Sequence, residues 1–297
     1  MNGPGSVITQ EERRRSLEAV VSAAQFFRGK LLRATEGWPL DYLKESRTEE
    51  VLSEDSPWKV GYAPEASTSL VDHLAAQNVA YSTMEAAGLA VRAGDGSVAD
   101  RFRDQLMFVA RDAHLHPTGF IGIASDGEVQ TASPPTAIHQ ASMALTGVEE
   151  QIDLLRGGAA PVIVDDPMDA IAMSRMSRHS GGQWAAIPVL GDGLSTAQVR
   201  MLRKFSLGDT AIVIASGCEH RQKLTTGYLF DLALYYDRVR AVVLPHSLTA
   251  IGAAKSGPQI INHVLTTARP VLTYRVGDVP TTERARDPES PDDGPGL

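Results

Sequence analysis

The sequence predicts an α/β protein: an α+β part at the N-terminus, then a mostly parallel sheet flanked by helices. The β-branched run Val162, Ile163 and Val164 is typical of a parallel strand that is buried on both faces. Strand-like and helix-like segments alternate regularly from residue 148 to residue 276, which favours a parallel sheet with helices on both sides. Residues 10–35 show the apolar spacing of an amphipathic helix.

The N-terminal part should combine helices with antiparallel strands. A short polar helix is expected around Leu43, another helix over residues 70–77, and a third between Ser82 and Glu85, which form a capping-box pair. A strand is expected over 58–62. Segments 89–93, 106–111 and 119–124 resemble one antiparallel group joined by Asp-Gly turns, followed by an exposed Ser-Pro-Pro connection at 133–135.

The C-terminal part should alternate between helices and strands. Ser195 and Gln198 form a second capping pair, and Pro167 suits the first turn of a helix. Strands are expected over 161–164, 184–190, 210–215, 240–244 and 271–276, and helices over 148–155, 167–176, from 195, 224–236 and 257–267. The segment from 277 is rich in Pro, Gly, Asp and Glu, so disorder is expected there. We therefore predict a first domain over 10–145, a second over 146–276 and an acidic tail over 277–297.

Composition limits the classes of function. The formal net charge of −8 disfavours strong nucleic-acid binding by the chain as a whole, since proteins that grip phosphates usually show a basic footprint. No apolar run reaches the ~18 residues of a membrane span, and the N-terminus lacks an apolar signal core. The single cysteine, Cys218, cannot form an internal disulfide. These features predict a cytoplasmic protein with no membrane partner.

Three acids gather where the strand 161–164 ends. Asp165, Asp166 and Asp169 could supply oxygen ligands to Mg²⁺ or Mn²⁺ at the carboxyl end of a strand, where α/β proteins place their chemistry. The alternative is structural. Asp165 and Asp166 would cap the following helix, and Asp169 would lie in its first turn.

Several blocks in order resemble one family. Residues 100–108 read Asp-Arg-Phe-Arg-Asp-Gln-Leu-Met-Phe and precede Gly-Phe-Ile-Gly at 119–122, which resembles the signature of the bacterial replicative primases of the DnaG type. Further blocks at 23–27, 42–47, 59–64, 85–89 and 133–136 resemble family segments in the same order. The resemblance covers about residues 20–276, and it implies that the alternating region is a TOPRIM domain.

The resemblance also implies an incomplete acidic centre. Asp165 stands where the family has a glutamate that acts as general acid/base, and Asp169 matches an acid that is kept. The family's metal-binding Asp-x-Asp pair is replaced by Ser216 and Cys218, and residues 245–249 lack a further acid. Nucleotidyl transfer needs metal ions to neutralise developing charge, so this substitution predicts loss of polymerase chemistry.

The resemblance assigns Arg101 and Arg103 to contact with the nucleic-acid backbone. Gln105 stands where the family has a third arginine. The simpler interpretation is a solvated strand face, with both arginines paired to Asp100 and Asp104 and lying opposite Phe102.

Three weaker motifs have simpler explanations. Cys218 and His220 lack further ligands, and a lone cysteine near a strand end is usually inert packing. His114 and His116 alternate as metal ligands can, but the sequence identifies no third ligand. The Gly-Asp-Gly at 191–193 fits a strand-to-helix turn better than a phosphate cradle.

The favoured hypothesis is a primase-like protein that lacks polymerase activity and serves DNA replication or DNA transfer as a binding or accessory component. Its partners would be single-stranded DNA or replication and transfer proteins. One alternative is a metal-dependent phosphotransferase or nuclease that uses Asp165 and Asp169. Another is a protein-interaction module with no nucleic-acid role. The sequence leaves the oligomeric state open.

Overall fold

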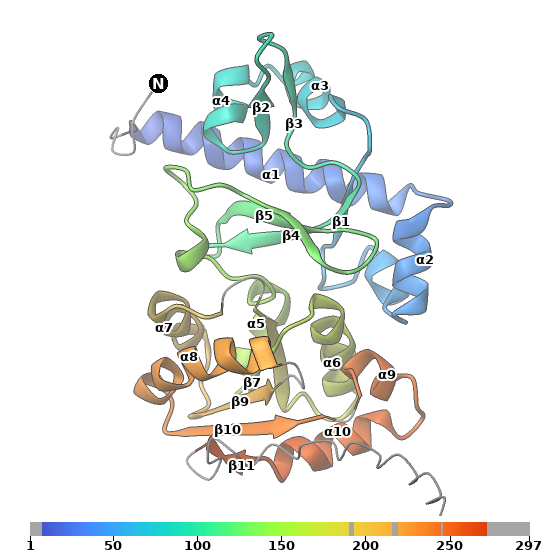
Figure 1. Ribbon diagram of the computed structural model, residues 1–297, viewed down its shortest axis with the longest axis vertical. Helices are drawn as coiled ribbons and strands as arrows, with labels where there is room; N and C mark the ends of the chain where they lie inside the picture. The colour runs from blue at the N-terminus through green and yellow to red at the C-terminus, as the bar shows by residue number, and fades with distance from the viewer. Residues whose placement is uncertain (1–7, 190–192, 216–218, 245, 272–297) are drawn as a thin grey trace, which may run out of the picture.

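The computed structural model describes residues 8–189, 193–215, 219–244 and 246–271. Within these residues the chain forms a four-stranded antiparallel sheet, a separate two-stranded hairpin and a five-stranded, mostly parallel sheet. Figure 1 shows the antiparallel sheet in the upper half of the molecule and the five-stranded sheet below it. The predicted α/β class, with a mostly parallel second sheet, is confirmed.

The described elements follow the predicted order closely. The helices are α1 (Gln10–Leu32), α2 (Trp38–Glu45), α3 (Ser69–Ala76), α4 (Tyr81–Ala86), α5 (Ile152–Arg156), α6 (Pro167–His179), α7 (Thr196–Phe205), α8 (Glu219–Tyr235), α9 (Leu248–Gly252) and α10 (Gly257–Thr266), with 3-10 turns η1 (Glu49–Leu52), η2 (Ala141–Met143) and η3 (Glu149–Gln151). The strands are β1 (Gly61–Ala63), β2 (Ala90–Arg92), β3 (Val98–Asp100), β4 (Gln105–Arg111), β5 (Pro117–Ile123), β6 (Val129–Ala132), β7 (Ala160–Val164), β8 (Trp184–Pro188), β9 (Thr210–Ala215), β10 (Arg238–Val243) and β11 (Arg269–Pro270).

Helix α1 organises the N-terminal part. It starts at a capping box in which Thr9 and Glu12 satisfy each other's backbone N–H groups, and its apolar stripe is buried. In Figure 1 this helix runs between the antiparallel sheet and the layer that holds α3, α4 and the β2–β3 hairpin. Phe27 of α1 meets Phe102 and Phe120 edge to face, with ring centroids 6.4 and 5.3 Å away. These aromatic contacts join the helix to the sheet.

The four strands of the antiparallel sheet lie in the order β1-β4-β5-β6. Strand β1 approaches α1 so closely that a Cβ on Gly61 would lie 2.6 Å from the Cβ of Phe27 and 2.8 Å from its backbone carbon. Only glycine allows this contact, because both opposing atoms belong to or adjoin the helix backbone. The Gly61 of the Lys-Val-Gly-Tyr segment therefore has a packing role.

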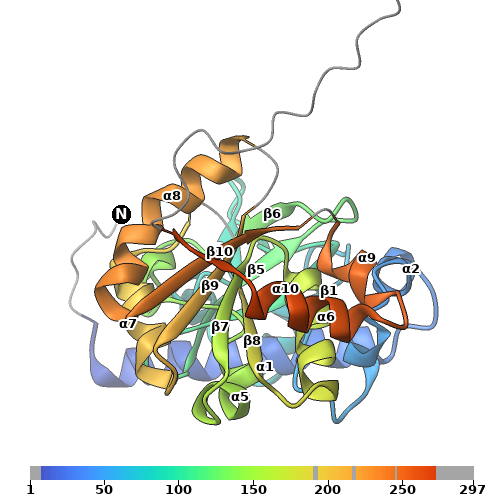
Figure 2. The same cartoon turned by 90° about the horizontal axis from the view of Figure 1, so that it is seen from below.

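The five-stranded sheet has the order β11-β10-β9-β7-β8, in which β8, β7, β9 and β10 are parallel and β11 is antiparallel. Val162 and Val164 of β7 pack in a cluster with residues of α6, α9 and α10, while Ile163 packs with residues of α7 and α8. Figure 2 shows these two groups of helices on either side of the strands. The uninterrupted apolar run of β7 thus reflects burial on both faces.

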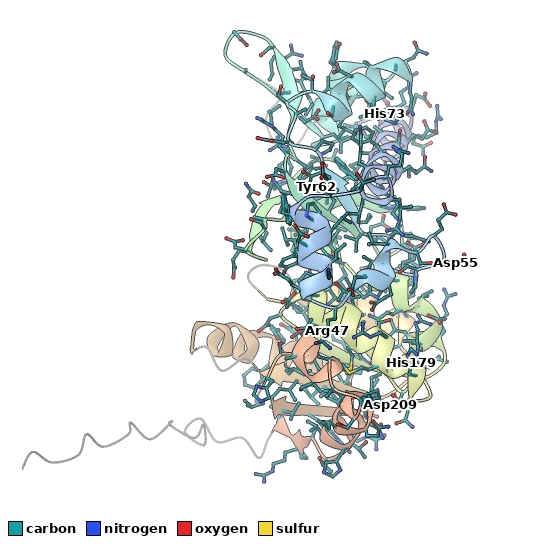
Figure 3. The ribbon with its side chains drawn as sticks, turned by 90° about the vertical axis from the view of Figure 1, so that its right-hand side faces the viewer. Arg47, Asp55, Tyr62, His73, His179 and Asp209 are labelled. Carbon is teal, nitrogen blue, oxygen red and sulfur yellow. The ribbon has the colours of Figure 1, made fainter. Side chains whose placement is uncertain are left out.

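One hydrophobic cluster crosses from the antiparallel part to the parallel part. It contains Leu43, Val51 and Phe108 together with Val164 and Met168. Arg47, which Figure 3 shows where the two parts meet, adds a hydrogen bond from its guanidinium to the Ala253 carbonyl at 3.2 Å. Because the core is continuous here, the division at residue 145 stays a prediction.

Three local expectations are wrong, and one short helix was missed. Ser82 and Glu85 form no capping box, because α4 begins at Tyr81 after Ala80, which offers no side-chain oxygen. Segment 89–93 pairs with β3 as a separate hairpin and does not join the β4–β5 group. Ser133 is buried, because its hydroxyl accepts the Phe120 N–H at 2.8 Å. Helix α9 was not expected, because its five residues are too few to show a period.

Four predictions lie wholly or partly outside the described residues: the strand beyond residue 271, the tail over 277–297, the Gly-Asp-Gly turn at 191–193 and the packing of Cys218. The last described strand, β11, pairs with β10 through Arg269 and Pro270. Among the described helices, none combines the length and the apolar character needed to cross a bilayer.

Candidate functional site

The β7–α6 junction brings the three predicted acids together. Asp165 directly follows β7 and is half-buried. Asp166 is the N-cap residue of α6, since its side chain accepts the Met168 N–H at 2.7 Å. Pro167 occupies the first helical turn, where its missing N–H costs nothing. The capping role that the sequence left open is therefore correct for Asp166.

Asp169 links helix α6 to helix α9 by a hydrogen bond. Its carboxylate oxygen Oδ1 accepts the backbone N–H of Thr249 at 2.9 Å, at the start of α9. Burial raises the pKa of Asp169, and hydrogen bonds from Thr249 and Leu248 act in the opposite direction. A carboxylate at a helix N-terminus also interacts favourably with the exposed N–H groups there. Asp169 therefore already has protein partners that compete with a metal ion.

Tyr42 of α2 belongs to the same region, and the sequence alone gave no sign of a role for it here. Burial first, and then the negative charges of Asp166, Asp126 and Asp169, raise its pKa to about 12. Asp126 comes from the β5–β6 turn, whose Gly127 lies against the Tyr42 hydroxyl. The Tyr42 phenol and the β5–β6 turn, both from the N-terminal part of the chain, therefore lie close to the acids of the β7–α6 junction.

The neighbouring strands add few carboxylates. The sequence after β9 reads Ser216, Gly217 and Cys218, and these residues lie outside the described part of the chain. The next acid in the sequence is Glu219, the first residue of α8 and four residues beyond the end of β9. The residues after β10 from Leu244 to Thr249 contain no acid.

These residues do not fit a pair of metal ions. Two metal ions need several carboxylate oxygens converging from different strands. Here Asp166 caps α6 and Asp169 binds α9, so at least two of the three acids already have partners in the protein. Asp165 and Asp169 remain the residues from which a single hard cation would take oxygen ligands.

The side chain of Arg101 is partly buried. It follows β3, and its backbone N–H donates to the Leu89 carbonyl at 3.0 Å. Its Nε is buried and finds no hydrogen-bond partner among the described residues. Burial alone lowers the pKa of this guanidinium, so no carboxylate offsets its desolvation. Within the described part of the chain, this guanidinium therefore lacks the partner that buried charges usually have.

Arg103 is exposed, and its Nε donates to the Glu65 carbonyl at 2.9 Å. No ion pair within 4 Å joins either arginine to a flanking acid among the described residues, although the charge of Arg103 acts to lower the pKa of Asp100. The carboxylate of Asp100 accepts the N–H groups of Leu70 and Val71 in the first turn of α3.

Asp104, at a positive φ of 52°, accepts hydrogen bonds from Trp38 Nε1 at 2.6 Å and from the Tyr62 hydroxyl at 2.8 Å. These bonds pin the segment that carries Arg101 and Arg103. The segment is not a strand, so the expected alternation of its side chains does not apply, although Phe102 is buried as predicted.

Gln105 does not extend the basic segment. It is buried, its Nε2 donates to Thr131 Oγ1 at 3.0 Å, and its side chain lies against Gly122. This hydrogen bond links β4 to β6 across the intervening strand β5. The arginine pair is thus the whole of this segment's cationic character within residues 100–108.

Comparison with known proteins agrees with this architecture. Residues 26–151 match the family model of the DNA primase catalytic core, N-terminal domain. A DNA primase of Synechococcus elongatus is 33% identical over 201 residues, which cover 65% of this chain and 28% of that protein. A DNA primase of Deinococcus radiodurans is 28% identical over 260 residues, covering 86% of this chain and 43% of that protein. The chain spans less than half the length of these curated relatives.

Solved structures share the fold. A DnaG primase catalytic domain bound to single-stranded DNA superposes with a TM-score of 0.73 at 19% identity, covering 88% of this chain and 84% of that one. The E. coli primase catalytic core gives a TM-score of 0.70 at 19% identity, covering 86% and 80%. In fold and in the order of its segments, the chain resembles a primase catalytic core with a TOPRIM-like second sheet. It is similar in sequence and fold to the bacterial DnaG-type primase catalytic core.

Proposed function

We propose that this protein binds single-stranded nucleic acid as an accessory component of DNA replication or DNA transfer and does not synthesise primers. One contrast carries the proposal. The acids at the β7–α6 junction are largely committed to helix starts, whereas the Arg101 guanidinium has no carboxylate partner among the described residues.

The proposed lack of primer synthesis rests on the small number of carboxylates near the ends of β7 and β9. Transfer of a nucleotide requires cations that neutralise the phosphates and align the attacking and leaving oxygens. The sequence has serine and cysteine after β9, where the resemblance implies two aspartates. Asp165, held at the end of β7, does not supply enough ligands alone.

The proposed binding of single-stranded nucleic acid rests on Arg101 and Arg103. Arg101 is partly desolvated and unpaired among the described residues, so a phosphate oxygen would complete its hydrogen bonding. The related catalytic domain of similar fold has been solved with single-stranded DNA. The net charge of −8 opposes tight binding, so we expect a weak interaction that depends strongly on salt.

The first test is a template-dependent primer-synthesis assay with Mg²⁺ and with Mn²⁺. We expect no product with either ion. Robust synthesis that Asp165→Asn abolishes would overturn the proposed loss of polymerase activity, whatever the outcome of the binding experiment.

The second test measures binding of a fluorescent single-stranded oligonucleotide by anisotropy at several salt concentrations. Arg101→Ala and Arg103→Ala should weaken binding, and each lost phosphate contact should reduce the salt slope by about 0.7. Arg156→Ala is the matched control, because this exposed arginine ends α5, away from the basic segment. No binding, or equal binding by all variants, would instead favour the protein-interaction module.

A single-metal phosphotransferase or nuclease is the second candidate, supported by Asp165 and Asp169 on one junction. It predicts calorimetric binding of Mg²⁺ or Mn²⁺ that Asp165→Asn removes and Asp209→Asn leaves unchanged. Absence of any metal-dependent heat at millimolar ion concentration would eliminate this candidate.

A further inference from the structure

The loop between β4 and β5 gathers a carboxylate and two imidazoles. We propose that Asp112, His114 and His116 form a binding site for one divalent transition-metal ion of the Zn²⁺ class. Each residue offers one ligand atom, and these three atoms lie within 4.8 Å of one another. The site belongs to the β4–β5 loop, not to the β7–α6 junction, and it does not depend on the function proposed above.

The carboxylate is held in the orientation that a metal ligand needs. One oxygen of Asp112, Oδ1, accepts the backbone N–H groups of His114 at 2.8 Å and His116 at 3.0 Å. The other oxygen, Oδ2, lies 4.0 Å from Nδ1 of His114 and 3.5 Å from Nδ1 of His116. Such outer hydrogen bonds orient metal-ligating carboxylates in known sites.

These separations are close to those of a coordinated set. With metal–nitrogen and metal–oxygen bonds of about 2.1 Å, tetrahedral geometry places two ligand atoms about 3.4 Å apart. The 3.5 Å pair already fits, and the 4.0 Å pair needs a side-chain shift of a few tenths of an ångström. The two imidazole ligand atoms lie within 4.8 Å of each other, so they need to approach by at most about 1.4 Å. Both imidazoles are largely exposed, with side-chain exposures of 73% and 58%, so they are free to make this shift.

The backbone of the loop fixes the two histidines on the same side. Leu115, between them, has a φ of +65°, a left-handed conformation that a leucine rarely adopts. The Asp112 N–H bonds the His116 carbonyl at 3.0 Å, and the Leu115 N–H bonds the Asp112 carbonyl at 2.9 Å. As a result the two rings stack, with centroids 5.8 Å apart and planes at 23°. Strain of this kind persists only where the surroundings hold it.

The loop is anchored to the parallel part of the molecule. Lys204 of α7 donates to the Ala113 carbonyl at 2.6 Å, and Arg111 donates to the Leu115 carbonyl at 3.1 Å. Ala113 and Leu115 also pack against the cluster that contains residues of α7 and α8. An ion bound here would stiffen a loop of the antiparallel sheet that packs against the parallel part.

The donor set selects the class of ion. Imidazole suits Zn²⁺, Ni²⁺, Co²⁺ and Cu²⁺, whereas Mg²⁺ and Ca²⁺ prefer oxygen ligands. Three ligands on an exposed loop leave at least one coordination position for water or for a group from another molecule. The site therefore differs in chemistry from the Mg²⁺ or Mn²⁺ centre considered at the β7–α6 junction.

The test is calorimetric titration of the full chain with Zn²⁺, followed by the visible absorption of the Co²⁺ form. We expect one ion per chain. Loss of a second-shell partner costs a metal site roughly 10–100-fold in affinity, so His114→Ala and His116→Ala should each weaken binding at least that much. Asp112→Asn should also weaken it, but part of this loss could come from the loop.

Two controls separate this site from other ligands. His263→Ala removes another exposed imidazole, and Cys218→Ser removes the only thiol of the sequence. Both variants should bind Zn²⁺ as the parent chain does. Zn²⁺ should raise the midpoint of thermal unfolding of the parent, but not that of the His114→Ala, His116→Ala double variant. No Zn²⁺ binding by the folded parent, or equal binding by the double variant, would overturn the proposal.

Discussion

Asp169 and Thr249 lie 80 residues apart in the chain, yet the Asp169 carboxylate accepts the Thr249 backbone N–H at 2.9 Å. This bond links α6 to the short helix α9 and stands at the place where the sequence suggested a metal ligand. A residue type that suits a cation also suits a helix N-terminus, because both present positive charge to the carboxylate. Asp169 is thus explained by a structural hydrogen bond, even though the family resemblance suggested a catalytic role.

Asp169→Ala should lower the free energy of unfolding by about 1–3 kcal/mol, because it leaves a half-buried N–H of α9 without its acceptor. Asp169→Asn should cost much less, since the amide oxygen can accept the same bond. Urea denaturation at neutral pH measures the difference. Equal losses for both variants would show that the charge, and not the hydrogen bond, is what stabilises α9.

Glu150 should give the protein a pH-dependent stability. Burial raises the pKa of its carboxyl to about 7, from 4.5, although Arg111 acts in the opposite direction. Between about pH 4.5 and about pH 7 the folded state keeps a proton that the unfolded state has released. The free energy of unfolding should therefore fall as pH rises through this window.

Glu150→Gln should remove this part of the pH dependence, because an amide does not titrate. The matched control is Glu149→Gln, whose carboxylate pairs with Arg111 and is more exposed. Denaturation curves at four pH values between 4.5 and 7.5 give the slopes. The assignment to Glu150 fails if its glutamine variant retains the parent's slope.

Phe102 should be the main anchor of the basic segment. It is 1% exposed and contacts Phe27 and Phe120 edge to face. Phe102→Ala should cost about 3–5 kcal/mol. Phe230→Ala, at a side chain that is 79% exposed, should change stability by less than about 0.5 kcal/mol. Thermal and chemical unfolding of the two variants compare a buried aromatic residue with an exposed one.

Gly61→Ala should destabilise the protein by about 1–3 kcal/mol, because the new methyl group would overlap the backbone of α1 at Phe27. Gly94→Ala is the control, since no atom lies within 4 Å of the position its Cβ would take. The same unfolding measurement applies. Similar stability of both variants would contradict the close α1–β1 packing.

Local signals in the sequence were sufficient for most elements. The β-branched run gave β7, the apolar period gave α1, and Ser195 with Gln198 gave the capping box of α7. These features depend on neighbours a few residues apart, so a sequence records them directly. The pair Ser82 and Glu85 shows the limit of such signals, because α4 starts at Tyr81 and the predicted box does not form.

The candidate site depended on contacts across the chain. Tyr42 meets the charges of Asp166 and Asp169 only because α2 folds onto the β7–α6 junction, and no local pattern encodes that approach. The third ligand beside His114 and His116 was equally hidden. Asp112 lies only two residues before His114, but its carboxylate faces the imidazoles because the backbone turns at Leu115.

The sequence by itself determined the class of fold, the order of the elements and the presence of Ser216 and Cys218 where two aspartates were expected, since each is written in residue types and short spacings. The tertiary structure decided what the retained charges do. It placed Asp166 and Asp169 at helix starts, and it left the Arg101 guanidinium without a carboxylate partner among the described residues. The physical reason is that a charged side chain takes its role from the groups that folding brings within hydrogen-bonding distance, and these come from distant parts of the chain.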